Sequence, residues 1–361
     1  MRTRKQTRAE ETTTADAASS PTPSSPAPPT VVSITKIEGP AVTAAPASKR
    51  DVEDAKTAVR SPSSKLPKLI QFPLVAILSL AISQLGYSLA WAHTKGALTA
   101  HARLLSTWTD FGLVVGWRLF ELALGWFGNY DGYDITALNL MSSGPLLYLL
   151  FAFYEIPASA LLITLGIETI ATYIPFRLLR PLSVAHSDPR RAPNAEIVAD
   201  RPIALLTTLL AGAIYSVTLF FAYATYLPSY LVVYFKSLPS VASAHEATYV
   251  GLLPVTLVLG FAARSFIFAP AADGAPGAER FDPVRASLPE TVRWNFWGWS
   301  EQTKLVIRRT ALLMLVSGVN TFLQTRLTVD GVETPGALAW SSVWVLGAAV
   351  TGLGLAVVGS V

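Results

Sequence analysis

Seven long apolar segments lie between residue 70 and the C-terminal end, and they decide the solvent in which this chain folds. Five are continuous, namely Ile70–Trp91, Pro145–Ile170, Ile203–Leu227, Tyr249–Ala269 and Ala337–Gly359. Each has about the 20 predominantly apolar residues with which an α-helix crosses a bilayer core of roughly 30 Å. Two weaker segments, Leu104–Phe127 and Thr310–Leu323 with its flanks, carry charge. The sequence therefore predicts an all-α fold, a polytopic transmembrane helix bundle of about seven spans.

The composition excludes several functional classes. Charged residues make up only 14% of the chain, and the net charge is +4. The basic residues lie in the N-terminal tail and in the links between spans, where membrane proteins place them to set orientation. We therefore expect the lipid bilayer, and no nucleic acid, as a partner. The chain has no cysteine, which excludes disulfides and thiol catalysis.

The N-terminal tail differs in composition from the rest. Residues 1–68 are rich in Thr, Ser, Ala, Pro and charge. Such a segment buries too little apolar surface to offset its ordering entropy, so we expect it to be disordered, followed by a transmembrane domain at 69–361. The opening MRTRKQTR is soon followed by Glu10 and Glu11, which disfavours a mitochondrial transit peptide. An endomembrane or the plasma membrane is the expected location.

The charges of the links predict an orientation but conflict with those of the tail. The links 171–202 and 270–303 are basic, whereas 128–144 and 326–336 are not. The positive-inside rule then places the first, third and fifth links, beginning with 93–105, in the cytosol. Basic residues just before the first span argue for a cytosolic tail as well. Both signals hold only if an even number of spans separates the tail from 171–202. Seven spans are favoured, with six spans and a surface helix at Leu104–Phe127 as the alternative.

Five ionisable residues fall within predicted spans: Arg118, Glu121, Glu155, Glu168 and Arg264. Charges inside a membrane are costly, so by default they mark a functional site. Arg118 and Glu121 are three residues apart on one helical face, and Glu155 lies next to Pro157, which should kink its span. We expect Arg118, Glu121 and Glu155 to form a polar cluster that binds a solute, a proton or a lipid headgroup. The alternative is a structural ion pair that orients the helices.

The last span carries small residues at four-residue spacing, Ala348, Gly352 and Ala356. Small residues on one face let membrane helices approach closely. We expect this face to pack within the chain, with a homo-oligomer or another membrane protein as the alternative partner.

Signatures of catalysis are missing from the sequence. None of the four histidines, His93, His101, His186 and His245, lies in an HExxH motif, and no pair has the helical spacing of metal ligands. There is no nucleophile elbow and no phosphate-binding loop. We therefore expect no catalytic residue, no metal and no cofactor. The preferred hypothesis is a non-catalytic structural or accessory component of an internal membrane. A small-solute transporter or channel and a lipid-modifying enzyme are the alternatives.

One stretch near the C-terminus resembles a known group. Arg309-Thr-Ala-Leu-Leu, Asn320-Thr-Phe-Leu-Gln-Thr, Val329-Asp-Gly-Val-Glu333 and Trp340-Ser-Ser-Val-Trp344 resemble the C-terminal region of a group of fungal multi-span membrane proteins. The resemblance covers about the last third of the chain. It implies the same architecture and an endomembrane setting, and it brings no activity or site residue.

Overall fold

The computed structural model describes residues 67–94, 96–187, 200–268, 287–289, 291–292 and 301–359. Eight long helices lie in these ranges: α2 (Lys68–Thr94), α3 (Trp108–Phe127), α4 (Gly132–Phe153), α5 (Ala158–Leu179), α8 (Arg201–Ala224), α11 (Tyr249–Ile267), α13 (Glu301–Thr328) and α14 (Thr334–Gly359). Short helices α6 (Val184–Ser187), α9 (Leu227–Tyr234) and α10 (Ala242–His245) lie in the links. The predicted all-α fold is confirmed. The β pairing found in the described ranges is limited to two isolated bridges.

Seven of these helices are long and apolar enough to cross a membrane, as the sequence predicts, but they are not the predicted seven. The exception is α3, whose 20 residues include Asp110, Arg118 and Glu121. At 1.5 Å per residue α3 is about 30 Å long, enough to cross a bilayer core. The seventh apolar helix instead comes from Pro145–Ile170, which is two helices, not one.

The chain reverses direction at Tyr154–Pro157, so the prediction of a single kinked span there is wrong. Pro157 has no N–H and restricts the residue before it to extended conformations. It is the N-cap of α5, and Glu155 takes a left-handed conformation with φ 54°. The hydropathy signal runs across this tight turn because the residues on both sides are apolar. The first half of α4, by contrast, contains several polar residues, so the apolar segment in the sequence begins only at Pro145 and does not show where α4 starts.

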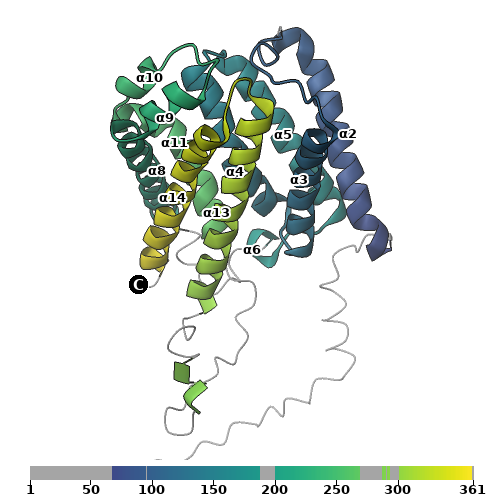
Figure 1. The fold of residues 1–361 in the computed structure, drawn as a ribbon. Coiled ribbons are helices and arrows are strands. Elements are labelled where there is room, and N and C mark those ends of the chain that lie inside the picture. The colour runs from purple at the N-terminus through teal and green to yellow at the C-terminus, as the bar shows by residue number, and fades with distance from the viewer. Residues whose placement is uncertain are drawn as a thin grey trace, which may run out of the picture. The chain divides into compact units, whose positions relative to one another are not determined.

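The ends of the helices form two distinct faces (Figure 1). At one, which we call the bridged end, backbone bridges join Ala102 to Val329 and Phe235 to Val332. These bridges tie together the links that follow α2, α9 and α13. We call the opposite face the basic end, because it carries a set of basic side chains: Arg177, Arg180, Arg201, Lys304, Arg308 and Arg309. There α2, α4, α8 and α13 begin and α3, α5, α11 and α14 end.

This arrangement corrects the predicted orientation of the first link. The α2–α3 link lies at the bridged end, because the amide of Arg103 donates to the carbonyl of Thr328. The start of α8 lies at the basic end, so the first and third links are at opposite ends, not on one side. Four helices, α2 to α5, separate the start of α2 from the α5–α8 link. This is the even number that the two charge signals require. The additional span arises because the predicted single span Pro145–Ile170 contains parts of two helices, α4 and α5, which the turn at Tyr154–Pro157 separates.

Close helix contacts build the core around α4 and the C-terminal helices. Helix α4 packs against α5, α11 and α13, and α8 packs against α11. Gly260 of α11 lies so close to the backbone of Gly212 that any side chain there would collide with α8. On α14, Gly352 lies against Thr310 of α13, Ala348 is fully buried, and Ala356 is partly buried against the core. The described small-residue face therefore contacts the chain's own helices, while its role in assembly remains a prediction.

The N-terminal tail lies outside the described residues. The chain divides into two units, Met1–Val59 and Arg60–Val361. The structure describes only the second unit, from Pro67 onward. The predicted disorder of residues 1–68 and the boundary at 68/69 therefore remain predictions.

The orientation can be tested on a natural background, because the chain has no cysteine of its own. We expect Ala100→Cys and Ser243→Cys, at the bridged end, to react with a membrane-impermeant maleimide from one side of sealed vesicles. Ser187→Cys, on α6 at the basic end, should react only after the other side is exposed. Labelling of Ala100→Cys and Ser187→Cys from the same side would contradict the eight-helix arrangement.

Candidate functional site

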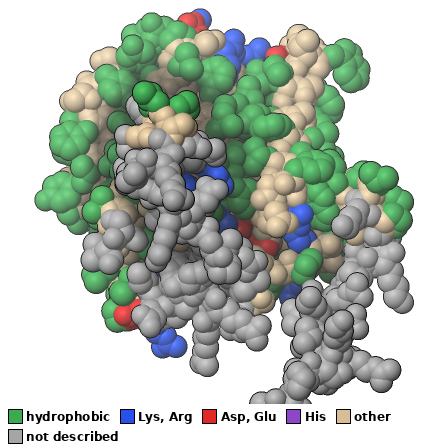
Figure 2. Space-filling view, turned by 90° about the horizontal axis from the view of Figure 1, so that it is seen from below, with side chains coloured by type: hydrophobic (Ala, Val, Ile, Leu, Met, Phe, Trp, Pro, Cys, Tyr) green, Lys and Arg blue, Asp and Glu red, His purple; other side chains and the backbone are tan. Residues whose placement is uncertain are grey.

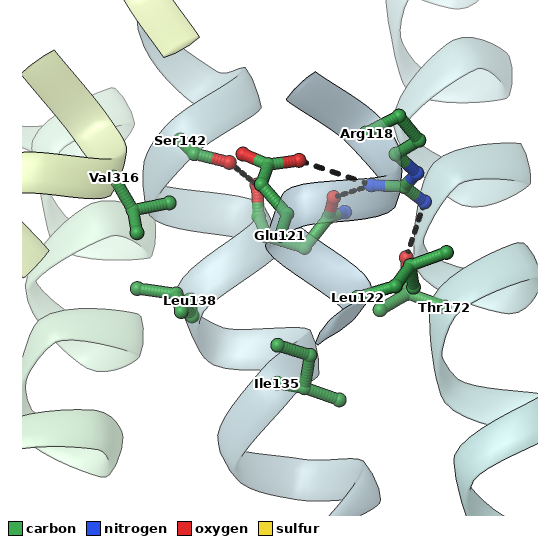
Figure 3. A pocket seen from close by; sticks show the side chains of 9 residues that line it. Arg118, Glu121, Leu122, Ile135, Leu138, Ser142, Thr172 and Val316 are labelled. Carbon is green, nitrogen blue, oxygen red and sulfur yellow. Dashed lines mark hydrogen bonds and ion pairs between the residues drawn. The ribbon is translucent and has the colours of Figure 1, made fainter. Parts of the chain in front are cut away.

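A set of polar side chains crosses the middle of the bundle, and we call it the polar belt. It joins five helices, and its members are Tyr87 (α2), Arg118 and Glu121 (α3), Asn139 and Ser142 (α4), Glu168 and Thr172 (α5) and Asn320 (α13). Figure 3 shows its centre, where Arg118 and Glu121 of α3 face side chains of α4 and α5.

Arg118 is the hub of the polar belt. Its guanidinium donates to Asn139 Oδ1 at 2.8 Å and to Thr172 Oγ1 at 2.8 Å. The same group lies 3.6 Å from the Glu121 carboxylate and 3.3 Å from the Glu168 carboxylate. A guanidinium presents five N–H donors in a fixed plane, so it can serve several helices at once. Arg118 therefore ties α3 to both α4 and α5.

The belt continues outward from this hub on both sides. The Tyr87 hydroxyl donates to Glu168 at 2.7 Å, which connects α2. On the other side, Asn320 Nδ2 donates to the carbonyl of Ser142 at 2.9 Å, which connects α13. Interhelical hydrogen bonds of this kind hold membrane helices together where the hydrophobic effect does not. The space enclosed by Arg118, Glu121, Asn139, Ser142 and their apolar neighbours has room for about one water molecule.

The structure brings together two of the three predicted cluster residues. Arg118 and Glu121 are in contact, as their spacing suggests. Glu155 is exposed in the α4–α5 turn at the bridged end, so the expectation that it meets Arg118 in mid-span is wrong. Glu168 takes its place. Arg264, the remaining ionisable residue of the predicted spans, donates from Nε to Thr207 of α8 at 3.0 Å.

A second polar group, at the basic end, was not predicted. We call it the capping cluster, and it comprises Asp131, Asp134, Ser183, His186 and Arg309. Asp131 is the N-cap of α4 and accepts from the amides of Tyr133 and Asp134. Its other oxygen accepts from Ser183 and contacts His186 Nδ1 at 2.6 Å. This cluster fixes the end of α5 and the short helix α6 against the start of α4.

Arg309 extends the capping cluster to α11 and α13. Its Nη1 donates to Asp134 Oδ1 at 2.8 Å and to the carbonyl of Phe266 at the end of α11. A second nitrogen donates to the other oxygen of Asp134 at 3.3 Å. The pair is buried, and breaking a buried bidentate pair leaves an uncompensated charge. Arg309 therefore holds the beginning of α13 to the beginning of α4.

The capping cluster resembles a metal site in composition only. Ligand atoms of Asp131, Asp134 and His186 lie within 4.8 Å of one another. Both oxygens of Asp131 already accept hydrogen bonds, and both oxygens of Asp134 accept from Arg309. The positive charge that a metal ion would bring to these carboxylates is already supplied by Arg309 and by His186. The donor set therefore fits an ion-pair network better than a metal.

The same cluster is not arranged as a nucleophilic triad. In a Ser-His-Asp triad the serine and the aspartate contact opposite nitrogens of the histidine. Here Ser183 Oγ lies 3.2 Å from His186 Nδ1, the nitrogen that also contacts Asp131. Ser183 donates its proton to Asp131 at 2.8 Å. The histidine is therefore not placed to activate the serine.

The pKa values of the capping cluster follow from its hydrogen bonds. Burial alone would raise the pKa of Asp131, but hydrogen bonds from His186, Asp134 and Ser183 outweigh it and lower that pKa below its usual range. Burial would lower the pKa of His186, and the hydrogen bond and charge of Asp131 outweigh it, so that the pKa is raised. His186 and Asp131 thus favour the charged pair.

The sequence held a signal for part of this cluster. Asp131-Gly-Tyr-Asp134 is a helix start, with a capping aspartate followed by acid in the first turn. The role of Arg309 could not be predicted, because its partners Asp134 and Phe266 are far away in the sequence. It depends on the packing of α13 against α4 and α11.

The outer surface agrees with a membrane setting. Figure 2 views the molecule from the basic end, where apolar side chains form much of the periphery. Large apolar side chains on the long helices are widely exposed, with Phe127 at 75% and Leu178 at 68%. A soluble monomer rarely exposes apolar surface so continuously. The charged side chains of the described long helices instead lie inside the bundle or near its ends.

Comparison with known proteins adds one family. Residues 200–358 match the family model of the bouquet formation protein 3 C-terminal domain, a range that runs from α8 through most of α14. The range contains the stretches that resemble fungal membrane proteins. No curated protein and no solved structure matches the chain. Helices α2 to α5, which hold most of the polar belt, lie outside the match.

Removal of the hub should destabilise the bundle. Arg118→Gln leaves the acidic side chains of Glu121 and Glu168 without the guanidinium that they share, and we expect a loss of about 3–5 kcal/mol in unfolding free energy. Unfolding in detergent, followed by circular dichroism, measures it. Glu155→Gln is the matched control and should stay within about 0.5 kcal/mol of wild type, because Glu155 is exposed in a turn. Adding Glu168→Gln to Arg118→Gln should recover part of the loss. As single changes, Glu168→Gln should cost more than Glu155→Gln, and equal costs for these two variants would contradict this account.

The capping cluster should make stability depend on pH. The raised pKa of His186 gives a stabilisation that is complete below its ordinary value of 6.5 and lost as pH rises through the folded value. The lowered pKa of Asp131 gives a stabilisation present above its ordinary value of 3.8 and lost in stronger acid. We therefore expect the cost of His186→Gln, measured by thermal unfolding, to be larger at pH 5.5 than at pH 9. His245→Gln, on exposed α10, is the control. A cost that does not change with pH would refute the pairing.

Proposed function

We propose that this chain is a non-catalytic accessory protein embedded in an internal membrane, acting in bouquet formation, the process that the matched family is named for. The observation that carries the proposal is the way the interior polar groups are used. Arg118, Glu168, Asp134 and Arg309 each bond to side chains or backbone of other helices. They serve as connections between helices, and the family match supports a role without chemistry.

The size of the interior space also supports this proposal. A site for a small solute encloses several hundred Å³ in most proteins, whereas the space beside Glu121 and Asn139 admits about one water molecule. A transporter or channel, the first alternative, rests on the charged belt and would need that space to open. A lipid-modifying enzyme, the second alternative, would need a reactive group, and Ser183 is oriented away from that role.

A lateral partner fits the proposal. An accessory membrane protein acts through the helices or loops it offers to other proteins, so we expect another membrane protein or a second copy of this chain as the partner. The basic end is the preferred face for aqueous contacts, because it carries the arginine-rich links. The positive-inside rule would place this end in the cytosol or an equivalent compartment.

Genetic replacement separates an accessory role from a catalytic one. We expect deletion of the gene to impair bouquet formation, and Ser183→Ala and His186→Gln to restore it when their protein levels match wild type. Arg118→Gln should fail together with a fall in protein level, because it harms the fold. Loss of function in Ser183→Ala at normal level would indicate catalysis. An unaffected process in the deletion strain would refute the assignment to bouquet formation.

Reconstitution addresses transport. We expect proteoliposomes that hold the purified chain and the pH-sensitive dye pyranine to keep an imposed pH gradient as long as empty liposomes do. Accelerated decay that Glu121→Gln abolishes would favour the transporter alternative.

A further inference from the structure

The polar belt has an unbalanced charge count. Two carboxylates, Glu121 and Glu168, lie 3.6 and 3.3 Å from one guanidinium, that of Arg118. Neither carboxylate forms another ion pair in the described ranges, and the third ionisable neighbour, Tyr87, is a hydrogen-bond donor to Glu168. The belt residues contributed by α4 and α13 are uncharged. If both acids were ionised, the middle of the bundle would carry one surplus negative charge.

Such a surplus charge is costly in this position. The Glu121 side chain is 9% exposed and that of Glu168 is 20% exposed. When two carboxylates share one buried site with a single cation, the site is more stable if one of them stays protonated. The remaining acid and Arg118 then form a neutral pair. The belt should therefore hold one proton.

The hydrogen bonds indicate which acid holds it. Both oxygens of Glu168 are engaged, one by the Tyr87 hydroxyl at 2.7 Å and the other by Arg118 at 3.3 Å. In Glu121 only Oε2 faces Arg118, while Oε1 is buried and has no hydrogen-bond partner among the described residues. An unpaired buried oxygen is unfavourable as an anion but can serve as the O–H of a protonated acid. Glu121 is thus the better holder of the proton.

The neighbouring space supplies an acceptor for that O–H. Glu121, Asn139 and Ser142 line the one-water cavity, and Figure 3 shows the Glu121 carboxylate between Arg118 and Ser142. Asn139 Nδ2 is likewise buried without a partner within the described part of the chain. A water there can accept from Glu121 and from Asn139 and donate to Ser142 Oγ, which matches the three bonds typical of a buried water.

We propose that the polar belt is a proton- and water-binding site, in which Glu121 is protonated and bonds to one water held against Asn139 and Ser142. The site neutralises the belt, so the charged helix α3 can lie within an apolar bundle. This inference is independent of the proposed function, since it would hold for an accessory protein and for a transporter alike.

Infrared spectroscopy of the full chain in detergent tests the proton. A protonated carboxyl group has a carbonyl band separate from that of a carboxylate, and it shifts in D₂O. We expect this band at neutral pH in wild type and in Glu155→Gln, the exposed control, and its loss in Glu121→Gln. Glu121→Gln should keep the thermal stability of wild type, because the amide replaces a neutral group. Absence of the band in wild type would overturn the proposal.

Environment-changing variants decide which acid carries the proton, since removing either carboxylate would balance the charge. Ser142→Ala alters only the cavity side, and Tyr87→Phe alters only the Glu168 side. We expect Ser142→Ala to shift the carboxyl band and Tyr87→Phe to leave it in place. A shift in Tyr87→Phe alone would put the proton on Glu168 and refute the assignment to Glu121. A band unchanged in Ser142→Ala would refute the bound water. These two variants keep the test valid if Glu121→Gln fails to fold.

Discussion

The contact of Arg118 with two other helices is the interaction on which the N-terminal half of the bundle depends. Helix α3 carries three acidic or basic side chains, and an isolated helix of this kind would be poorly soluble in lipid. The guanidinium reaches Asn139 of α4 and both Thr172 and Glu168 of α5, so the neighbouring helices satisfy the charge of Arg118. Tyr87 then attaches α2 through Glu168. At the end of α3 a second polar tie to α5 is provided by Arg180, which donates to the carbonyls of Gly125 and Trp126.

The C-terminal helices are held together differently. Between α8 and α11 the closest contact is steric, with Gly260 against Gly212, beside a hydrogen bond from Arg264 to Thr207. Between α13 and α14 Gly352 lies against Thr310. These helices gain their stability from close backbone approach and dispersion, in the manner of small-residue membrane interfaces. The family match covers this half and leaves out the half that relies on charge. The two halves meet at α4, where Asn320 and Arg309 of α13 bond to Ser142 and Asp134.

Hydropathy predicted the fold class because a membrane helix can be recognised from a local stretch of about 20 predominantly apolar residues. It failed at Tyr154–Pro157, where the turn is only a few residues long and a single charged residue, Glu155, interrupts the apolar segments on both sides. The contact between Arg118 and Glu121 was predictable because they are three positions apart on one helix. The partnership with Glu168 was not, because it depends on how α3 and α5 pack. The wrong choice of Glu155 followed directly from the hidden turn.

The even number of long helices has a consequence for how the protein meets its surroundings. The chain enters α2, leaves α14, and makes its α5–α8 and α11–α13 connections at the basic end. At the bridged end the links after α2, α9 and α13 are short and tied to each other through their backbones. If all eight helices cross the membrane, one aqueous compartment receives most of the polypeptide available for recognition. The other compartment faces only the bridged end, with its short, mutually bonded links. The two faces of the protein therefore offer unequal lengths of polypeptide to partners. A partner on the side of the bridged end would have to act through the helices.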